Sequence, residues 1–111
     1  MGVRIISSKN KTTAYLDGEI DHHTSAPIRE ELDSEIMFRK PQVLCIDFDC
    51  VTFMDSSAIG LVMGRYRTLT AVGGKLIVSG LSPQFYKIMK LSGIEKIAKV
   101  NRRENKHDTE K

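Results

Sequence analysis

Two adjacent serines follow an aspartate where a predicted strand gives way to a predicted helix. The segment reads Phe53-Met54-Asp55-Ser56-Ser57-Ala58-Ile59-Gly60. An apolar run at residues 43–48 precedes it, and an apolar helical pattern at residues 58–69 follows it. At a helix N-terminus, unpaired backbone N–H groups and the positive end of the helix dipole face solvent. A serine at this point can cap the helix, attack an electrophile or carry a phosphate.

The role of nucleophile can be weighed from the residues nearby. Serine hydrolysis requires a base within hydrogen-bond reach of the hydroxyl and an oxyanion hole. His22 and His23 are the candidate bases, but the G-x-S-x-G elbow is absent around Ser56. A small hydrolase that uses Ser56 with either histidine stays as an alternative, which a fluorophosphonate probe would reveal.

No metal or cofactor site is expected. Asp21-His22-His23 is the sole cluster of metal-ligating residue types, and adjacent histidines on a strand or turn diverge. Cys45 and Cys50 lack zinc-finger spacing. The P-loop pattern G-x-x-x-x-G-K-[ST] is also absent. Asp21 is instead expected to cap a helix.

The remaining role, phosphate acceptor, suits the physics of the segment. A phosphate with a charge near −2 at a helix N-terminus meets free N–H groups and a favourable dipole. Asp55 would oppose it in part by like-charge repulsion. The modified domain is therefore expected to stay folded, with the effect felt by whatever docks over the helix.

Size and composition restrict the class of protein. The chain has 111 residues, of which 41% are hydrophobic and 28% charged, as in one globular domain. No apolar run approaches the ~20 residues that span a bilayer, so no membrane association is expected. The net charge of +3 gathers after Lys96 instead of on a recognition element, which argues against direct nucleic-acid binding. The two cysteines are expected to be free thiols in a cytoplasmic protein.

Alternating helical and strand patterns predict an α/β domain with a mixed sheet. A hairpin is expected at residues 3–6 and 12–16, ending at Gly18. A helix capped by Asp21 or Thr24 follows, with an apolar stripe. Further elements are a buried strand at 43–48, a helix at 58–69, a strand at 75–79, a helix from Ser82 to Gly93 and a last strand at 94–100.

The helix at residues 58–69 carries two glycines on one face. Gly60 and Gly64 lie four residues apart, and each costs about 1 kcal/mol of helix stability relative to alanine. One interpretation is that they let the helix approach the sheet closely. The other is that this face is exposed and apolar, ready for a partner. Both interpretations stay open at this point.

At these residues the chain resembles the anti-sigma factor antagonists, single-domain bacterial members of the STAS family. The D-S-[ST]-G motif of that family corresponds to Asp55-Ser56-Ser57-Ala58, and Gly18-Glu19-Ile20-Asp21-His22-His23-Thr24 resembles the G-E-[LI]-D-H-H-T of its sporulation subgroup. The resemblance covers residues 3–100. It implies a single STAS-like domain, residues 1–100, with a mixed sheet of four to five strands and helices mainly on one face. Residues 101–111 would form a basic, frayed tail.

The resemblance implies a function without catalysis or cofactor. Such an antagonist binds an anti-sigma factor, which is a serine kinase with bound ATP, and thereby frees a sigma factor for transcription. The kinase phosphorylates the antagonist, the complex dissociates, and a metal-dependent protein phosphatase restores the active form. A STAS scaffold that is never phosphorylated, in a transport or stress-signalling complex, is the alternative.

The resemblance also assigns residues. Ser56, directly after the motif aspartate, corresponds to the phosphorylated serine. Ala58 replaces the usual glycine, which could stiffen the loop or crowd the kinase. The residues expected at the partner interface are Asp21, His22, His23, Thr24, Asp55, Ser57, Ala58, Gly60 and Met63.

Overall fold

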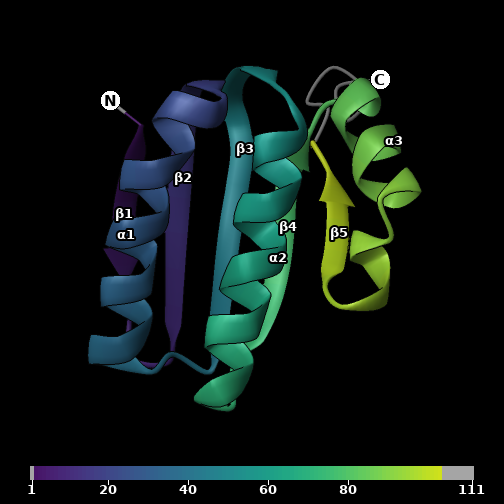
Figure 1. Ribbon diagram of the computed structural model, residues 1–111. Helices are drawn as coiled ribbons and strands as arrows, with labels where there is room; N and C mark the ends of the chain where they lie inside the picture. Colours follow the sequence, from purple (N-terminus) through teal and green to yellow (C-terminus); the bar gives the residue numbers. More distant parts are fainter. Residues whose placement is uncertain (1, 104–111) are drawn as a thin grey trace, which may run out of the picture.

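The computed structural model describes residues 2–103, which alternate between strands and helices after an opening hairpin (Figure 1). In chain order the elements are β1 (Val3–Ser7), β2 (Lys11–Ile20), α1 (His22–Arg39), β3 (Val43–Met54), α2 (Ser56–Ala71), β4 (Lys75–Leu81), α3 (Pro83–Leu91), a short 3-10 helix (Ile94–Lys96) and β5 (Lys99–Arg102). The predicted α/β class is confirmed.

The five strands form one mixed sheet in the order β1-β2-β3-β4-β5. β1 pairs antiparallel with β2, as the predicted hairpin requires, and the other neighbours pair in parallel. Parallel neighbours need a crossover, and a helix supplies each one. β3 lies at the centre, which explains its nearly continuous apolar run.

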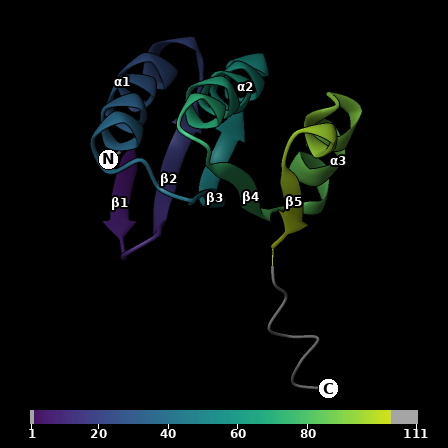
Figure 2. The same ribbon diagram turned by 90° about the horizontal axis from the view of Figure 1, so that it is seen from below.

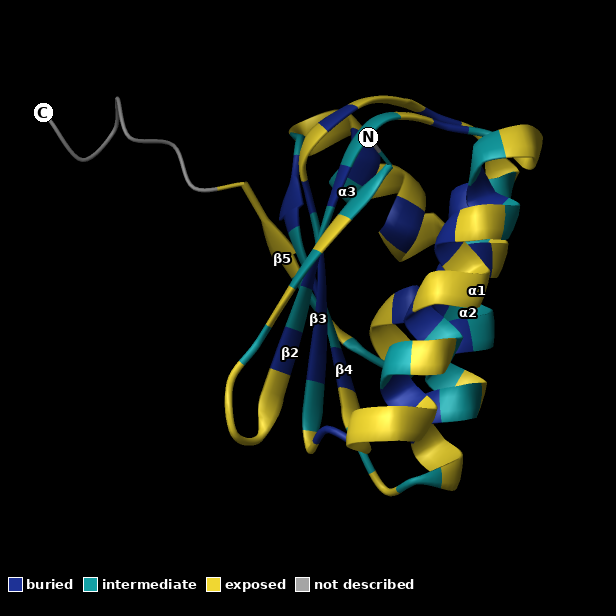
Figure 3. Ribbon diagram, turned by 90° about the vertical axis from the view of Figure 1, so that its left-hand side faces the viewer, coloured by how far each residue is buried: buried dark blue, intermediate teal, exposed yellow. Residues whose placement is uncertain are grey.

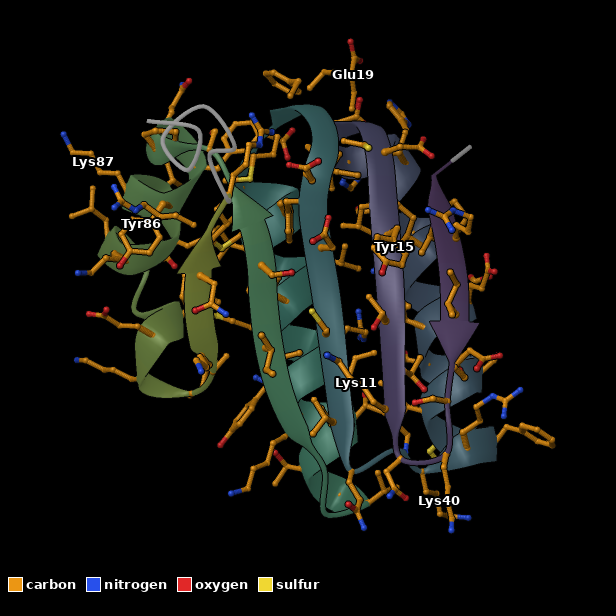
Figure 4. The ribbon with its side chains drawn as sticks, turned by 180° about the vertical axis from the view of Figure 1, so that it is seen from behind. Lys11, Tyr15, Glu19, Lys40, Tyr86 and Lys87 are labelled. Carbon is orange, nitrogen blue, oxygen red and sulfur yellow. The ribbon has the colours of Figure 1, made fainter. Side chains whose placement is uncertain are left out.

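The helices cover one face of this sheet. Figure 2 shows α1 and α2 side by side over the sheet, with α3 beside β5 on the same side. The buried faces of α1 and α2 point towards the strands (Figure 3). The opposite face of the sheet has no helix over it within residues 2–103, and Tyr15 and Lys11 project from it (Figure 4). The prediction that helices pack mainly on one face is therefore confirmed.

The core lies between the helices and the sheet. The predicted stripe of α1, Ile28, Leu32 and Ile36, is at most 3% exposed, because residues four apart stack on one helix face. Phe48 of β3 and Leu69 of α2 are fully buried in the same cluster. Burial of each such side chain contributes about 1.5–3 kcal/mol, which fixes both helices on the sheet.

Several predicted strand boundaries were wrong. β3 does not end at Phe48 but runs to Met54, and β4 continues to Leu81. Gly18 does not end β2; it adopts a φ of 78° at a bulge in the pairing with β3, and the strand continues to Ile20. The last strand also does not begin at Ile94. Gly93, with a φ of 87°, leads into the 3-10 helix, and β5 begins at Lys99 and runs through Arg102.

Both cysteines are free. Cys45 is buried in β3, where its Sγ lies 3.2 Å from Ser79 Oγ, and Ser79 Oγ donates to Asp47 Oδ2 at 2.9 Å. Cys50, in contrast, is exposed. No helix within residues 2–103 combines the length and the apolarity that crossing a bilayer requires.

Candidate functional site

The carboxyl ends of β2, β3 and β4 meet at one edge of the sheet, and a helix begins directly after each (Figure 1). A side chain caps each helix: Asp21 for α1, Asp55 for α2 and Ser82 for α3. Such caps satisfy backbone N–H groups that have no partner within the helix. Two of the three caps belong to the motifs that the sequence singled out.

The cap of α1 is a reciprocal pair between Asp21 and Thr24. Asp21 Oδ1 accepts hydrogen bonds from the backbone N–H of His23 at 2.9 Å and of Thr24 at 3.0 Å. Thr24 Oγ1 accepts from the backbone N–H of Asp21 at 2.9 Å and donates to the carbonyl of Glu19 at 2.8 Å. The bonds from Thr24 first, then from His23, hold the pKa of Asp21 below its ordinary value. Asp21 is the cap, and Thr24 completes it.

The cap of α2 places the serine pair at the helix terminus. Asp55 Oδ1 accepts a hydrogen bond from the backbone N–H of Ser57 at 2.8 Å. Ser56 is the first residue of the helix and is exposed, whereas Ser57 is half-buried. Within residues 2–103 the Ser56 hydroxyl makes no hydrogen bond to another residue. The capping role thus falls to Asp55, and Ser56 keeps an accessible hydroxyl.

The two capped turns lie side by side because β2 and β3 end in register. Ile20 pairs with Met54, the last residue of each strand. The backbone N–H of Asp55 then donates to the carbonyl oxygen of Ile20 at 3.2 Å. The turn that carries Asp21, His22 and His23 is thereby fixed beside the serine pair, although more than thirty residues separate the two motifs. Both histidines are exposed.

The glycines of α2 do not serve close packing against the sheet. A Cβ built at Gly60 or at Gly64 would meet no heavy atom within 4 Å. Gly60 is exposed, and Met63 beside it is half-buried. The interpretation that these glycines let the helix approach the sheet is wrong, and the open surface of α2 is what they create.

Ala58 lies on the other side of the same helix. Its side chain is fully buried in the core cluster, and its backbone N–H donates to the carbonyl of Asp55 at 3.0 Å. A methyl group in the core cannot crowd a protein that approaches from solvent. The expected contact between Ala58 and a partner is therefore not available in this conformation.

Among the described residues, the hydrogen-bonded serine–histidine pair typical of a serine hydrolase is not formed at Ser56. No histidine among the described residues hydrogen-bonds to Ser56 or Ser57. Over the same residues, no three His, Cys, Asp or Glu side chains converge as metal ligands. The edge presents an accessible hydroxyl, backbone N–H groups and charged side chains.

Sequence reasoning missed one residue close to the serines. Arg29 lines a cleft together with His22 of its own helix and Ser57 of α2. His22, Ser25 and Arg29 follow at spacings of three and four residues, so they share one face of α1. That spacing was visible in the sequence, but it could not show that this face turns towards the serines.

Comparison with known proteins places the chain among regulators of transcription. The family model described as STAS domain matches residues 5–107. The chain is 34% identical over 85 residues to an anti-sigma F factor antagonist of Paenibacillus polymyxa, covering 77% of this chain and 73% of that protein. It is 38% identical over 79 residues to an anti-sigma F factor antagonist of Lysinibacillus sphaericus, covering 71% of this chain and 68% of that protein.

Solved structures agree with the sequence relatives. The chain is similar to the anti-sigma factor antagonist SpoIIAA in its unphosphorylated form, with a TM-score of 0.80 and 28% identity over 97% of this chain and 93% of that one. It is also similar to the Bacillus cell fate determinant SpoIIAA in the phosphorylated form, with a TM-score of 0.73 and 28% identity over 98% of this chain and 97% of that one. The same fold therefore occurs in both phosphorylation states of that protein.

Proposed function

The chain belongs to the STAS domain family, and we propose that it is an anti-sigma factor antagonist that works by partner switching. The unmodified chain binds an anti-sigma factor and thereby releases a sigma factor for transcription. Phosphorylation of Ser56 ends this binding. The chain is a regulatory binding protein with no catalysis of its own, and it acts in the cytoplasm, where transcription takes place.

The observation that carries the proposal is the state of the Ser56 hydroxyl. It is exposed at the first residue of α2, and it makes no hydrogen bond within residues 2–103. A kinase can therefore reach the oxygen without unfolding the helix. Since Asp55 already caps α2, modification of Ser56 removes no capping interaction.

The chemistry of the site favours an acceptor over a nucleophile. A nucleophilic serine needs a neighbouring base that takes its proton. An acceptor serine needs access alone, because the kinase supplies the base and the ATP. The anti-sigma factor in this proposal is such a serine kinase, and a metal-dependent phosphatase reverses the modification.

A phosphate at this position changes the surface more than the fold. It adds a charge of about −1.5 to −2 at neutral pH next to the Asp55 carboxylate. The positive end of the α2 dipole and the N–H groups of its first turn offset that repulsion. The new charge lies on the surface that a partner covers, so it destabilises the complex with that partner more than it destabilises the fold.

The proposed partner surface spans both capped turns and the open side of α2. Asp21 and Thr24, which together cap α1, contribute the turn between β2 and α1 to this surface. The other residues that we assign to the partner surface are His22, His23, Asp55, Ser57, Gly60 and Met63. Ala58 is left out because its side chain is buried.

The test is reconstitution with the cognate kinase. The chain is incubated with the anti-sigma factor and ATP, and the phosphorylated residue is mapped by mass spectrometry. Binding is measured by calorimetry before and after modification. We expect phosphate on Ser56 and loss of binding. Phosphate on Ser57 alone would reject Ser56, and binding that survives full modification would reject the switch.

A further inference from the structure

A cleft of about 250 Å³ lies between the N-terminal halves of α1 and α2. It is lined by His22, Ser25 and Arg29 of α1 and by Ser57, Gly60 and Leu61 of α2. Gly60 leaves it open, because a Cβ there would meet nothing within 4 Å. Ser56 does not line the cleft, but it shares a helix face with Gly60, four residues on, which does.

The side chains that line this cleft are cationic or neutral. Arg29 is exposed and forms no ion pair with any residue between 2 and 103. The pKa of Arg65, which lies between the two helices, is lowered mainly by burial. The positive charge of Arg29 also contributes to lowering it. Asp33, the acid one turn further along the same face of α1, is already paired with Arg65 at 2.8 Å. No carboxylate lines the cleft, so Arg29 lacks a counter-charge there.

We propose that this cleft holds the phosphoryl group of phosphorylated Ser56, with Arg29 as the main phosphate-binding residue and His22 as the second. The proposal rests on Ser56 being the phosphorylated residue. Arginine presents several N–H donors that match phosphate oxygens, and histidine donates one N–H when neutral and two when protonated. Repulsion from Asp55, which caps the same helix turn, favours a rotamer of the phosphoserine that points into the cleft.

This arrangement gives Gly60 a part in the switch. A phosphate held between Arg29 and the first turn of α2 fills the space that Gly60 leaves open. The modified chain then lacks both a free hydroxyl and an open cleft. Occupation of the cleft would thus add to charge repulsion in ending the complex.

The test places phosphoserine at position 56 by genetic encoding, so it requires no kinase. The second ionisation of the phosphate is followed by ³¹P NMR titration in the full chain and in an unstructured phosphoserine peptide. Cations within about 4–6 Å favour the dianion. We expect the phosphate in the full chain to titrate about 0.5–1 pH unit below that in the peptide. The Arg29→Gln variant should lose most of this difference, and His22→Gln should lose a smaller part.

Arg67→Gln is the matched control, because Arg67 is an exposed arginine of α2 that does not line the cleft. It should titrate like the unaltered chain, and circular dichroism checks that every variant is folded. Identical titration of chain and peptide would overturn the proposal, as would equal effects of Arg67→Gln and Arg29→Gln. Failure of a kinase to modify Ser56 would instead reject the proposed function and leave this titration unaffected.

Discussion

Arg65 of α2 contacts Asp33 of α1 across the helix interface, with Nε 2.8 Å from Oδ1. The Arg65 side chain is 5% exposed and that of Asp33 is 37% exposed, so the pair lies at the border of the core. The two atoms that make this contact are themselves buried. Arg65 Nη1 also donates to the carbonyl of Leu61 at 3.2 Å. The pair holds together the two helices whose first turns carry the site.

Replacement of Arg65 by alanine is expected to destabilise the fold. The change removes the buried part of an ion pair and the packing of the arginine stem, but it leaves Asp33 partly solvated. We expect a loss of about 1–3 kcal/mol in the free energy of unfolding, measured by urea denaturation. Arg67→Ala, on the exposed side of α2, should change it by no more than about 0.5 kcal/mol. Equal effects of the two variants would contradict a role for the ion pair.

Asp21 is expected to make the stability of the fold depend on pH in the acidic range. Its pKa is lowered in the folded chain, first by the hydrogen bond from Thr24. The carboxylate therefore stabilises the fold above the unfolded pKa of about 4, and this contribution is lost as the pH falls through the lower folded value.

Asp21→Asn isolates that contribution. Asparagine is also a good helix cap, but it does not titrate. Thermal unfolding between pH 7 and pH 3 should show that the melting temperature of the unaltered chain falls more steeply below about pH 4 than that of Asp21→Asn. Asp21→Ala, which removes the cap, should melt lower than Asp21→Asn at pH 7. If the melting temperatures of all three proteins fell in parallel with pH, protonation of Asp21 would not be the cause of the loss of stability in acid.

The elements that the sequence predicted correctly are those determined by local chemistry. Helix starts at Asp21 and Ser82 depend on a side chain and the next three residues, and the stripe from Ile28 to Ile36 depends on helical periodicity. The order of strands and helices follows from such patterns. The resemblance to antagonists rested on short motifs for the same reason.

Features that depend on distant residues could not be predicted in this way. The side of α2 that carries Gly60 faces solvent because Ala58 and Leu61 face the core, and the apolar sequence around the whole helix concealed this. The pairing of Arg65 with Asp33 joins residues from different helices. Arg29 and Ser57 line the same cleft because α1 packs on α2, which no local pattern encodes.

Substitutions at Ser56 are expected to separate folding from switching. Ser56→Asp adds a negative charge at an exposed position, so we predict loss of kinase binding with unfolding that stays cooperative. Ser56→Ala should bind the kinase but accept no phosphate, and therefore cannot be released by ATP. Calorimetry and labelling with radioactive ATP measure the two properties. Tight binding by Ser56→Asp, or labelling of Ser56→Ala at the level of the unaltered chain, would contradict the assignment.

Gly60→Ala is expected to strengthen the fold and weaken the complex. Alanine in a helix interior gains about 0.5–1 kcal/mol over glycine, and the added Cβ meets no neighbour within 4 Å. The same methyl group narrows the cleft on the proposed partner surface. Gly64→Ala, one turn further on and equally uncrowded, should gain similar stability with a smaller loss of binding. Unfolding by urea and calorimetry with the kinase measure both effects.

Gly80 of β4 is expected to tolerate no side chain, because its backbone is left-handed and because a Cβ would clash with β3. Comparison with Gly73 separates these two effects. Its φ is 72°, and a Cβ would lie 2.7 Å from the backbone nitrogen of Asp49 and 2.9 Å from Asp47 Oδ2. Gly73 has a similar φ of 80°, but nothing lies within 4 Å of its Cβ position. Gly73→Ala should therefore cost only the left-handed backbone, about 1–2 kcal/mol. Gly80→Ala adds a clash with backbone that cannot move aside easily, for a total of about 2–4 kcal/mol in urea unfolding. Equal losses in the two variants would show that β3 and β4 can separate enough to admit a methyl group.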